Sequence, residues 1–148
     1  MRFILILSIA CVLLSCEKDK FTTKPQIKYK DVNTTTISGS QELRIRLDLT
    51  DKEGDFTTYL GVKKTVNGCP GSEFSDTTFF SIPAEFLNSK EKEGEVVITL
   101  NENNRLRNAC SVPGGGTRPD TTVFSFWTKD QAGNYSDTSY SATIIFLD

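Results

Sequence analysis

Apolar and polar residues alternate with a period of two along several stretches of the chain. The clearest stretch, ELRIRLDL at residues 42–49, carries an aliphatic side chain at each odd position and a charged one at each even position. Successive side chains of a β-strand point to opposite faces, so this pattern predicts a strand with one buried face. Runs rich in Phe, Ile, Val and Thr predict further strands at residues 26–32, 56–66, 76–82, 95–100, 122–129 and 138–147, with a short pairing segment at 35–38.

Turn-forming segments rich in Gly, Asn, Asp and Ser separate the expected strands, and PAEFLN at residues 83–88 predicts one turn of helix. About seven short strands with regular turns and few helical signals are typical of an all-β domain, and we expect an immunoglobulin-like antiparallel β-sandwich. Large side chains of the last two strands are expected in its core; they are Phe124, Phe126, Trp127, Ile144 and Phe146.

The N-terminus has a different character. Arg2 precedes about a dozen apolar residues, FILILSIACVLL at residues 3–14, which is the arrangement of a secretory signal peptide. The run is shorter than the roughly 20 residues that cross a bilayer. A buried core helix is the alternative interpretation.

The end of this leader indicates a lipid anchor. LLSC at residues 13–16 resembles the lipobox of bacterial lipoproteins. The resemblance implies that residues 1–15 are a cleaved signal peptide and that Cys16 becomes an acylated N-terminus inserted in a membrane. Residues 16–25 then tether a domain that spans residues 26–148. Each buried methylene adds about 0.8 kcal/mol of membrane affinity, so several acyl chains give a stable anchor.

The residues after the cysteine indicate a location. EKDK at residues 17–20 resembles the short charged signal that sends lipoproteins of Bacteroidota to the outer face of the outer membrane. The resemblance implies an outer-membrane protein exposed at the cell surface. Any solvated linker can have this composition, so the periplasmic face of the membrane stays open as the alternative.

Two turn segments extend the resemblance into the domain. DQAGNYS at residues 130–136 resembles the turn before the last strand of bacterial immunoglobulin-like and fibronectin-like domains, where Gly133 would supply a positive φ. LTDKEGD at residues 49–55 resembles a turn common in Bacteroidota lipoproteins that carry such a domain. Both segments indicate a fold, and neither indicates an activity.

Composition narrows the chemistry that the chain can perform. The net charge is −2 and the sequence has no basic stripe, so nucleic acid is not an expected partner. The chain contains no histidine, which excludes Ser/His/Asp and Cys/His catalysis and most zinc sites. We therefore expect a protein that is not an enzyme, with a hydrolase built on a carboxylate pair as the remote alternative.

Two cysteines are expected to form a disulfide. Of the four in the chain, Cys11 lies in the leader and Cys16 is the lipid site, which leaves Cys69 and Cys110. A disulfide is the default for such a pair in an oxidising compartment, and two free thiols are the alternative. In an immunoglobulin-like domain their two loops would share one pole.

Loops at the other pole would bring acidic residues together. In an immunoglobulin-like domain the loops after the second and sixth strands share that pole. These loops carry Asp51, Glu53, Asp55, Asp130 and Asn134. Calcium takes about six to eight oxygen ligands, so these residues are candidate ligands of a structural calcium ion; no other cofactor is expected. The alternative is that the aspartates cap turns by accepting hydrogen bonds from backbone N–H groups.

The pole far from the tether would carry the two longest loops. One of them holds Asn104, Arg105, Arg107 and Asn108, which are candidate binding residues because binding sites often lie on loops of a rigid scaffold. Surface insertions without a role are the alternative.

Together these features predict a membrane-anchored lipoprotein of the cell envelope that acts as a non-catalytic binding or adhesion module for a glycan or another envelope protein. The alternative is an accessory or structural subunit of an outer-membrane complex. Exposed aromatic residues on the distal loops would favour a glycan, but those loops contain only Phe74. An apolar patch on a sheet face, around Tyr59 or Trp127, would favour docking.

Overall fold

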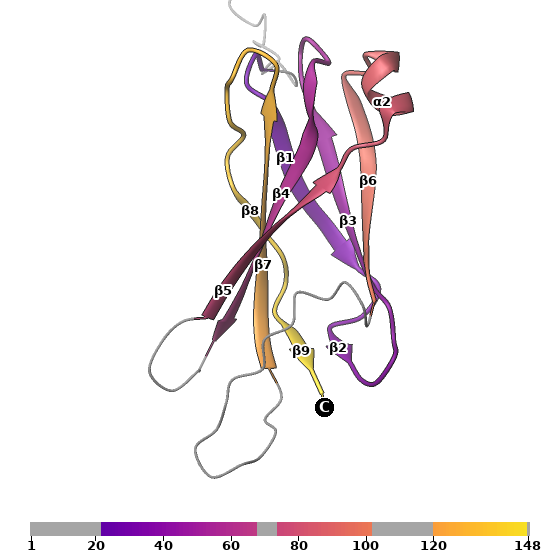
Figure 1. Cartoon of the computed structure of the whole chain (residues 1–148), viewed down its shortest axis with the longest axis vertical. Coiled ribbons are helices and arrows are strands. Elements are labelled where there is room, and N and C mark those ends of the chain that lie inside the picture. The colour runs from indigo at the N-terminus through magenta and orange to yellow at the C-terminus, as the bar shows by residue number, and fades with distance from the viewer. Residues whose placement is uncertain (1–21, 68–73, 102–119, 148) are drawn as a thin grey trace, which may run out of the picture.

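The fold is all-β, as the alternation pattern predicts. The computed structural model describes residues 22–67, 74–101 and 120–147, and in these ranges no helix is long and apolar enough to cross a membrane. Two β-sheets face each other across one hydrophobic core (Figure 1). The smaller sheet has the order β1-β3-β6, with antiparallel neighbours. Its strands are β1 (Gln26–Val32), β3 (Leu43–Thr50) and β6 (Glu93–Leu100).

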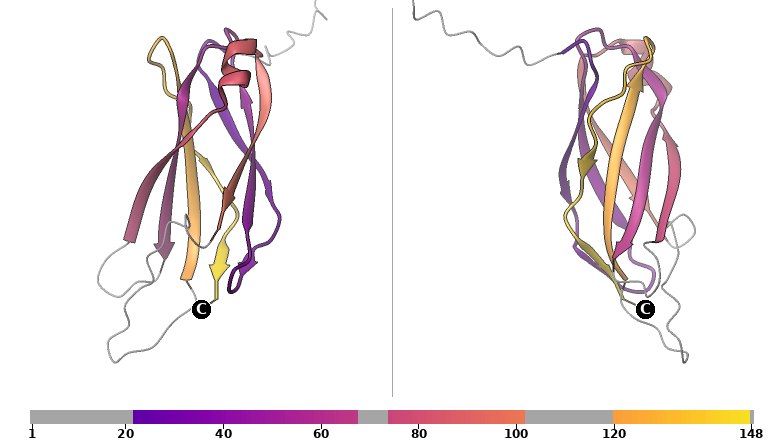
Figure 2. Two further views of the ribbon diagram at one scale, coloured as in Figure 1. Left: turned by 45° about the vertical axis from the view of Figure 1, so that its right-hand side comes forward. Right: turned by 90° about the vertical axis from the view of Figure 1, so that its left-hand side faces the viewer.

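The larger sheet has the order β2-β9-β7-β4-β5, and β8 pairs with β7 beside this path. Its strands are β2 (Thr36–Ile37), β4 (Phe56–Asn67), β5 (Phe74–Ser81), β7 (Asp120–Asp130), β8 (Ser139–Tyr140) and β9 (Ile144–Phe146). β2 and β9 run parallel, whereas the other neighbours are antiparallel. The helix α2 (Ala84–Ser89), at the predicted helical turn, joins β5 to β6. Because β5 is the last strand in the pairing order, it forms one border of the larger sheet (Figure 2).

The core lies between the inner faces of the two sheets. The aliphatic side chains at the odd positions of β3 are fully buried, which confirms the face predicted from alternation. Phe124, Phe126 and Ile144 are buried as expected, and Phe146 packs against them half-buried. The prediction that Trp127 lies in the core was wrong. Trp127 follows the inward-facing Phe126 in β7, so its side chain points to the outer face of the larger sheet.

The last predicted strand, residues 138–147, is divided into β8 and β9. Ser141 lies between them. Its N–H donates to the Phe124 C=O at 2.8 Å, and its Oγ accepts from the Phe124 N–H at 3.0 Å. A side-chain oxygen thus takes the place of a backbone acceptor, which interrupts the ladder. Beyond the interruption, β9 pairs with β7 and also with β2.

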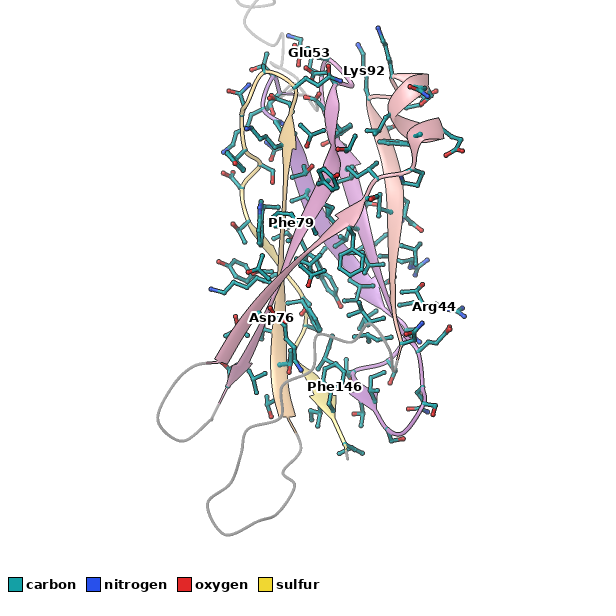
Figure 3. All side chains as sticks on the ribbon, viewed as in Figure 1. Arg44, Glu53, Asp76, Phe79, Lys92 and Phe146 are labelled. Carbon is teal, nitrogen blue, oxygen red and sulfur yellow. The ribbon has the colours of Figure 1, made fainter. Side chains whose placement is uncertain are left out.

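Two loops and the start of the described chain meet at one end of the molecule. The Gln131 N–H donates to the Asp55 C=O at 2.9 Å, so the β3–β4 and β7–β8 connections lie together, as predicted. The Lys52 N–H donates to the Thr22 C=O at 3.1 Å. Figure 3 shows Glu53 at this end. A tether that precedes Thr22 therefore joins the domain beside these loops.

Candidate functional site

A row of three residues crosses the outer face of the larger sheet. β4 places Gly61 opposite Phe79 of β5 on one side and opposite Trp127 of β7 on the other. The Trp127 indole lies over the Gly61 backbone, since a Cβ added at Gly61 would be 2.2 Å from Trp127 Cε2. The Phe79 ring meets the indole edge-on, with centroids 6.3 Å apart and planes at 85°. The missing side chain at Gly61 thus creates the space in which the indole lies.

Further side chains extend this row into a groove of about 410 Å³. We call it the aromatic groove; Thr57, Tyr59, Thr128, Lys129 and Tyr135 complete its lining. Tyr59 and Tyr135 each expose 57% of their surface, and Phe79 exposes 61%. Large apolar side chains gathered on one exposed face mark interaction sites on proteins. The apolar patch that would favour docking is therefore present around Tyr59 and Trp127.

The threonine and lysine side chains of the aromatic groove have partners within the protein. Thr57 Oγ1 donates to the Lys129 C=O at 2.9 Å, and Thr128 Oγ1 lies 3.5 Å from the Tyr59 C=O. Lys129 Nζ lies 5.1 Å from the centre of the Tyr135 ring, in a cation–π contact. None of the described lining residues is a carboxylate or an amide. The groove therefore offers ring stacking and apolar contact rather than acid–base chemistry.

Two of the predicted calcium ligands, Asp51 and Asp130, are buried where the loops meet, and each caps a turn. Asp51 Oδ2 accepts a hydrogen bond from the Asp55 N–H at 3.1 Å. Asp130 Oδ1 accepts from the Asn134 N–H, and its Oδ2 accepts from the Asn134 amide, both at 2.7 Å. Gly133 in that turn has a φ of 96°, the positive value expected. The turn-capping interpretation therefore holds for both aspartates.

Two carboxyl groups of this cluster have pKa values shifted in opposite directions. Burial, a hydrogen bond with the Asp51 carboxyl and the negative charges of Asp51 and Asp130 raise the pKa of Asp55. Burial also opposes the ionisation of Asp130, but hydrogen bonds from Asn134 and from backbone N–H groups outweigh it, and the pKa of Asp130 is lowered. Hydrogen bonds thus favour the ionised form of Asp130, whereas the ionised form of Asp55 is disfavoured.

Not all of the predicted calcium ligands converge in the described cluster. Glu53 is exposed to solvent. The Asn134 amide donates to Asp130. In the part of the chain that the structure describes, no three Asp, Glu, Cys or His side chains are placed to hold a metal ion together. Asp51 Oδ1, however, is buried without a hydrogen-bond partner among the described residues, so the calcium site stays a prediction.

The remaining predicted site residues lie outside the described ranges. They are the lipidation residue Cys16, the disulfide pair Cys69 and Cys110, and the candidate binding residues Asn104, Arg105, Arg107 and Asn108. The lipid anchor, the disulfide and the distal binding loops therefore stay predictions.

Two members of the aromatic groove, Tyr59 and Trp127, are the residues around which an apolar patch was predicted to favour docking. No role on this face was predicted for Gly61 or Phe79. The sequence carries two signals: Trp127 directly follows Phe126, a residue of the inner face, and Gly61 lies within a predicted strand. A glycine within a strand often marks close approach of another group. The pattern of one strand does not contain the register that sets Gly61 between the two rings.

Comparisons with known proteins assign no family to the chain. No family model matches it, and no curated protein does. Two solved structures are similar at 11% sequence identity. They are the alkylpurine DNA glycosylase AlkC of Pseudomonas fluorescens bound to DNA containing an abasic site analog, with a TM-score of 0.45, and the sporulation control protein Spo0M of Bacillus subtilis, with a TM-score of 0.46. Each match covers 86% of this chain, which spans 31% of the glycosylase chain and 51% of the Spo0M chain.

Proposed function

We propose that the protein is a lipid-anchored lipoprotein of the outer membrane and a non-catalytic binding module whose binding surface is the aromatic groove. The leader and the LLSC segment that ends at Cys16 support the anchor. Lys24 Nζ lies 2.5 Å from Asp137 Oδ1, so the first described residues are held against the segment that follows the β7–β8 turn. A tether at this end leaves the outer face of the larger sheet open to partners.

The domain fold that we propose is an immunoglobulin-like or fibronectin-like sandwich. The strand sets β1-β3-β6 and β9-β7-β4 have the order of strands A-B-E and G-F-C in that fold. β5 pairs with β4 instead of β6, so the fourth strand lies in the other sheet from its place in a constant-type immunoglobulin domain. The turn at Gly133 before the last strands supports the same assignment.

The aromatic groove is the observation that carries the binding role. Phe79 is among the most exposed large apolar residues that the structure describes, although its neighbour Phe80 packs against the core. A partner that removes such rings from water gains roughly 25 cal/mol for each Å² of apolar surface buried. The lining described for the groove contains no carboxylate pair, which supports a binding role over hydrolysis.

Docking within an outer-membrane complex is the second candidate function. The exposed rings lie on a sheet face around Tyr59 and Trp127, and the described loops carry fewer of them. Exposed apolar surfaces on a sheet face suit a protein partner. A docking subunit would co-purify with its complex in fixed stoichiometry, whereas an adhesion module would bind reversibly to an immobilised ligand.

The anchor is tested by labelling cells with a radioactive fatty acid and comparing the full chain with two cysteine variants. We expect the wild type and Cys11→Ala to carry label in the membrane fraction and Cys16→Ala to carry none. Cys11→Ala is the matched control because this cysteine lies within the leader. Unchanged labelling of Cys16→Ala would refute the lipid anchor.

The binding surface is tested with the full chain in detergent, presented with immobilised envelope proteins and with purified envelope glycans. We expect Trp127→Ala to weaken binding at least tenfold, the loss of about 1.4 kcal/mol or more that is typical of a central aromatic residue. Arg46→Ala, on the opposite outer face, should bind like the wild type. Equal binding by all three proteins would refute the aromatic groove as the binding surface.

A further inference from the structure

We propose that the partner of the aromatic groove is an extended peptide segment of another protein, which adds as a new strand to the free border of β5. The inference rests on the proposed binding role and names the class of its ligand. Three features of β5 support it: outward-facing backbone groups, an uncharged run at residues 77–81, and the position of Phe79 in both the border and the groove.

The backbone groups of alternate residues in β5 point away from the sheet. Just beyond the end of β5, the Ile82 N–H donates to the Thr58 C=O at 2.8 Å. Hydrogen-bonded pairs alternate along an antiparallel ladder, so even-numbered residues of β5 bond to β4 and the N–H and C=O groups of Thr77, Phe79 and Ser81 face outward. No strand in the described ranges pairs with this border. An extended polypeptide matches such groups, which repeat every 6.8 Å or so.

The other long borders carry features that discourage strand addition. β1 exposes Lys28 and Lys30 and contains a bulge, and β6 exposes Glu93 and Glu95. Charges and bulges are the devices by which natural proteins keep foreign strands from an open edge. β5 carries one charged residue, Asp76, and the five residues that follow it, 77–81, read TTFFS, without a charge or a proline. β5 is thus the long border with the fewest features that discourage the addition of a strand.

Phe79 joins this border to the aromatic groove. An added strand would lie about 4.8 Å from β5. The Cβ atom of its residue opposite Phe79 would lie about 4.5–5.5 Å from the Phe79 Cβ, on the same face. Its outward side chains would therefore pack beside the Phe79 ring and continue the apolar surface that runs to Trp127. The fitting ligand has apolar residues at alternate positions.

A glycan fits these features less well than a peptide. The two threonine hydroxyls of the groove face backbone acceptors within the protein, at 2.9 and 3.5 Å. The described lining offers no carboxylate or amide side chain to orient sugar hydroxyls. The outward N–H and C=O groups of β5 beside the groove have strand geometry, which selects a polypeptide.

Peptide binding tests the proposal directly. The probe is an array of immobilised octapeptides in which apolar residues alternate with threonine, exposed to the full chain in detergent. Each peptide is also presented with N-methyl groups on its odd-numbered or its even-numbered amides. We expect one methylated set to lose binding at least tenfold and the other to retain it, because only one set of N–H groups would face β5.

Variants of Thr77 test the same contact from the protein side. Thr77→Pro removes an outward N–H group, and Thr77→Ala keeps it. We expect Thr77→Pro to weaken peptide binding at least tenfold and Thr77→Ala to preserve it, with melting temperatures verifying that both variants fold. If the proline variant does not fold, Thr77→Lys places a charge at the border instead. Its matched control is Val97→Lys on the exposed border of β6.

Three results would overturn this inference while leaving the proposed binding role intact. Peptides that bind in a Trp127-dependent way, but tolerate both N-methylated sets and Thr77→Pro, would occupy the groove without adding a strand. Trp127-dependent binding to envelope glycans, with none to the peptides, would make the ligand a glycan. A dimer of the chain, detected by light scattering and lost in Thr77→Lys, would make the occupant a second copy. The binding role itself fails if Trp127→Ala changes none of these interactions.

Discussion

The outer faces of the two sheets differ sharply although both sheets cover the same core. The smaller sheet presents charges that pair with one another. Lys30 Nζ lies 2.6 Å from Glu95 and 3.5 Å from Asp48, and Arg46 donates from two nitrogens to both oxygens of Asp31. The larger sheet presents the rings of the aromatic groove, with Tyr140 exposed nearby at 64%. One face satisfies its charges internally, and the other leaves apolar surface in water.

The difference arises because folding constrains the inner positions of a strand, whereas contact with other molecules involves its outer positions. Alternation requires only that every second side chain of a strand enter the core, and it leaves the outer positions open. Charged outer positions keep the smaller sheet solvated and discourage association. Exposed rings contribute little to folding and raise the tendency to associate. The proposed binding role rests on their concentration on one face.

The largest loss of stability should come from a substitution of Phe126, the inward-facing neighbour of Trp127. We expect Phe126→Ala to lower the free energy of unfolding by about 3–5 kcal/mol, because it leaves a cavity in the core. Trp127→Ala should lower it by about 1 kcal/mol, because the indole is partly exposed. Chemical denaturation of both variants measures the contrast. Comparable losses would mean that the outer ring serves stability rather than contact.

Gly61→Val should cause the next largest loss of stability. A Cβ at this position overlaps the Trp127 indole, so the ring must leave the Gly61 backbone. We expect a loss of about 1–3 kcal/mol in unfolding free energy from overpacking, together with a red shift in the emission of the one tryptophan of the chain. Val97→Ala, which shortens an exposed side chain of β6, is the control. Unchanged emission would show that the indole does not lie on the glycine.

Arg46→Ala should change stability less than any of the three substitutions on the larger sheet. Its ion pair with Asp31 is half exposed, and exposed pairs contribute little because water and salt screen them. We expect a small fall in melting temperature at low ionic strength that disappears near 1 M salt. Melting curves at both ionic strengths measure it. A fall that persists at high salt would indicate that packing of the arginine stem, not charge, is lost.

The pH dependence of this ion pair should be the smallest effect. Hydrogen bonds from Arg46, together with its charge, hold the pKa of Asp31 below the usual value of 3.8. A lowered folded-state pKa gives stability that is present above the unfolded-state pKa and is lost as pH falls through the folded-state value. We therefore expect the stability advantage of the wild type over Asp31→Asn to be constant near neutral pH and to shrink below pH 3.8. An advantage that grows on acidification would contradict the lowered pKa.

Sequence patterns predicted what depends on neighbours along the chain. The period of two located most strands, and the turn chemistry around Asp130 and Gly133 matched the observed caps. Features set by neighbours across the sheet were missed. The core position predicted for Trp127 follows from its large apolar side chain, whereas its place next to Phe126 in the strand puts it on the outer face. The interruption at Ser141 depends on a hydrogen bond between its hydroxyl and the backbone of another strand. The aromatic groove depends on a register between three strands, which no single strand encodes.

The hydrogen bond from the Lys52 N–H to the Thr22 C=O has a mechanical consequence. It places the start of β1 at one end of the molecule, and β1 runs from there alongside β3 with antiparallel hydrogen bonds. These bonds lie perpendicular to the strands, so a pull on Thr22 along the long axis loads many of them in shear at once instead of opening them one by one. A domain that is anchored at this end and bound to a partner along its side would therefore resist a pulling force before it unfolds.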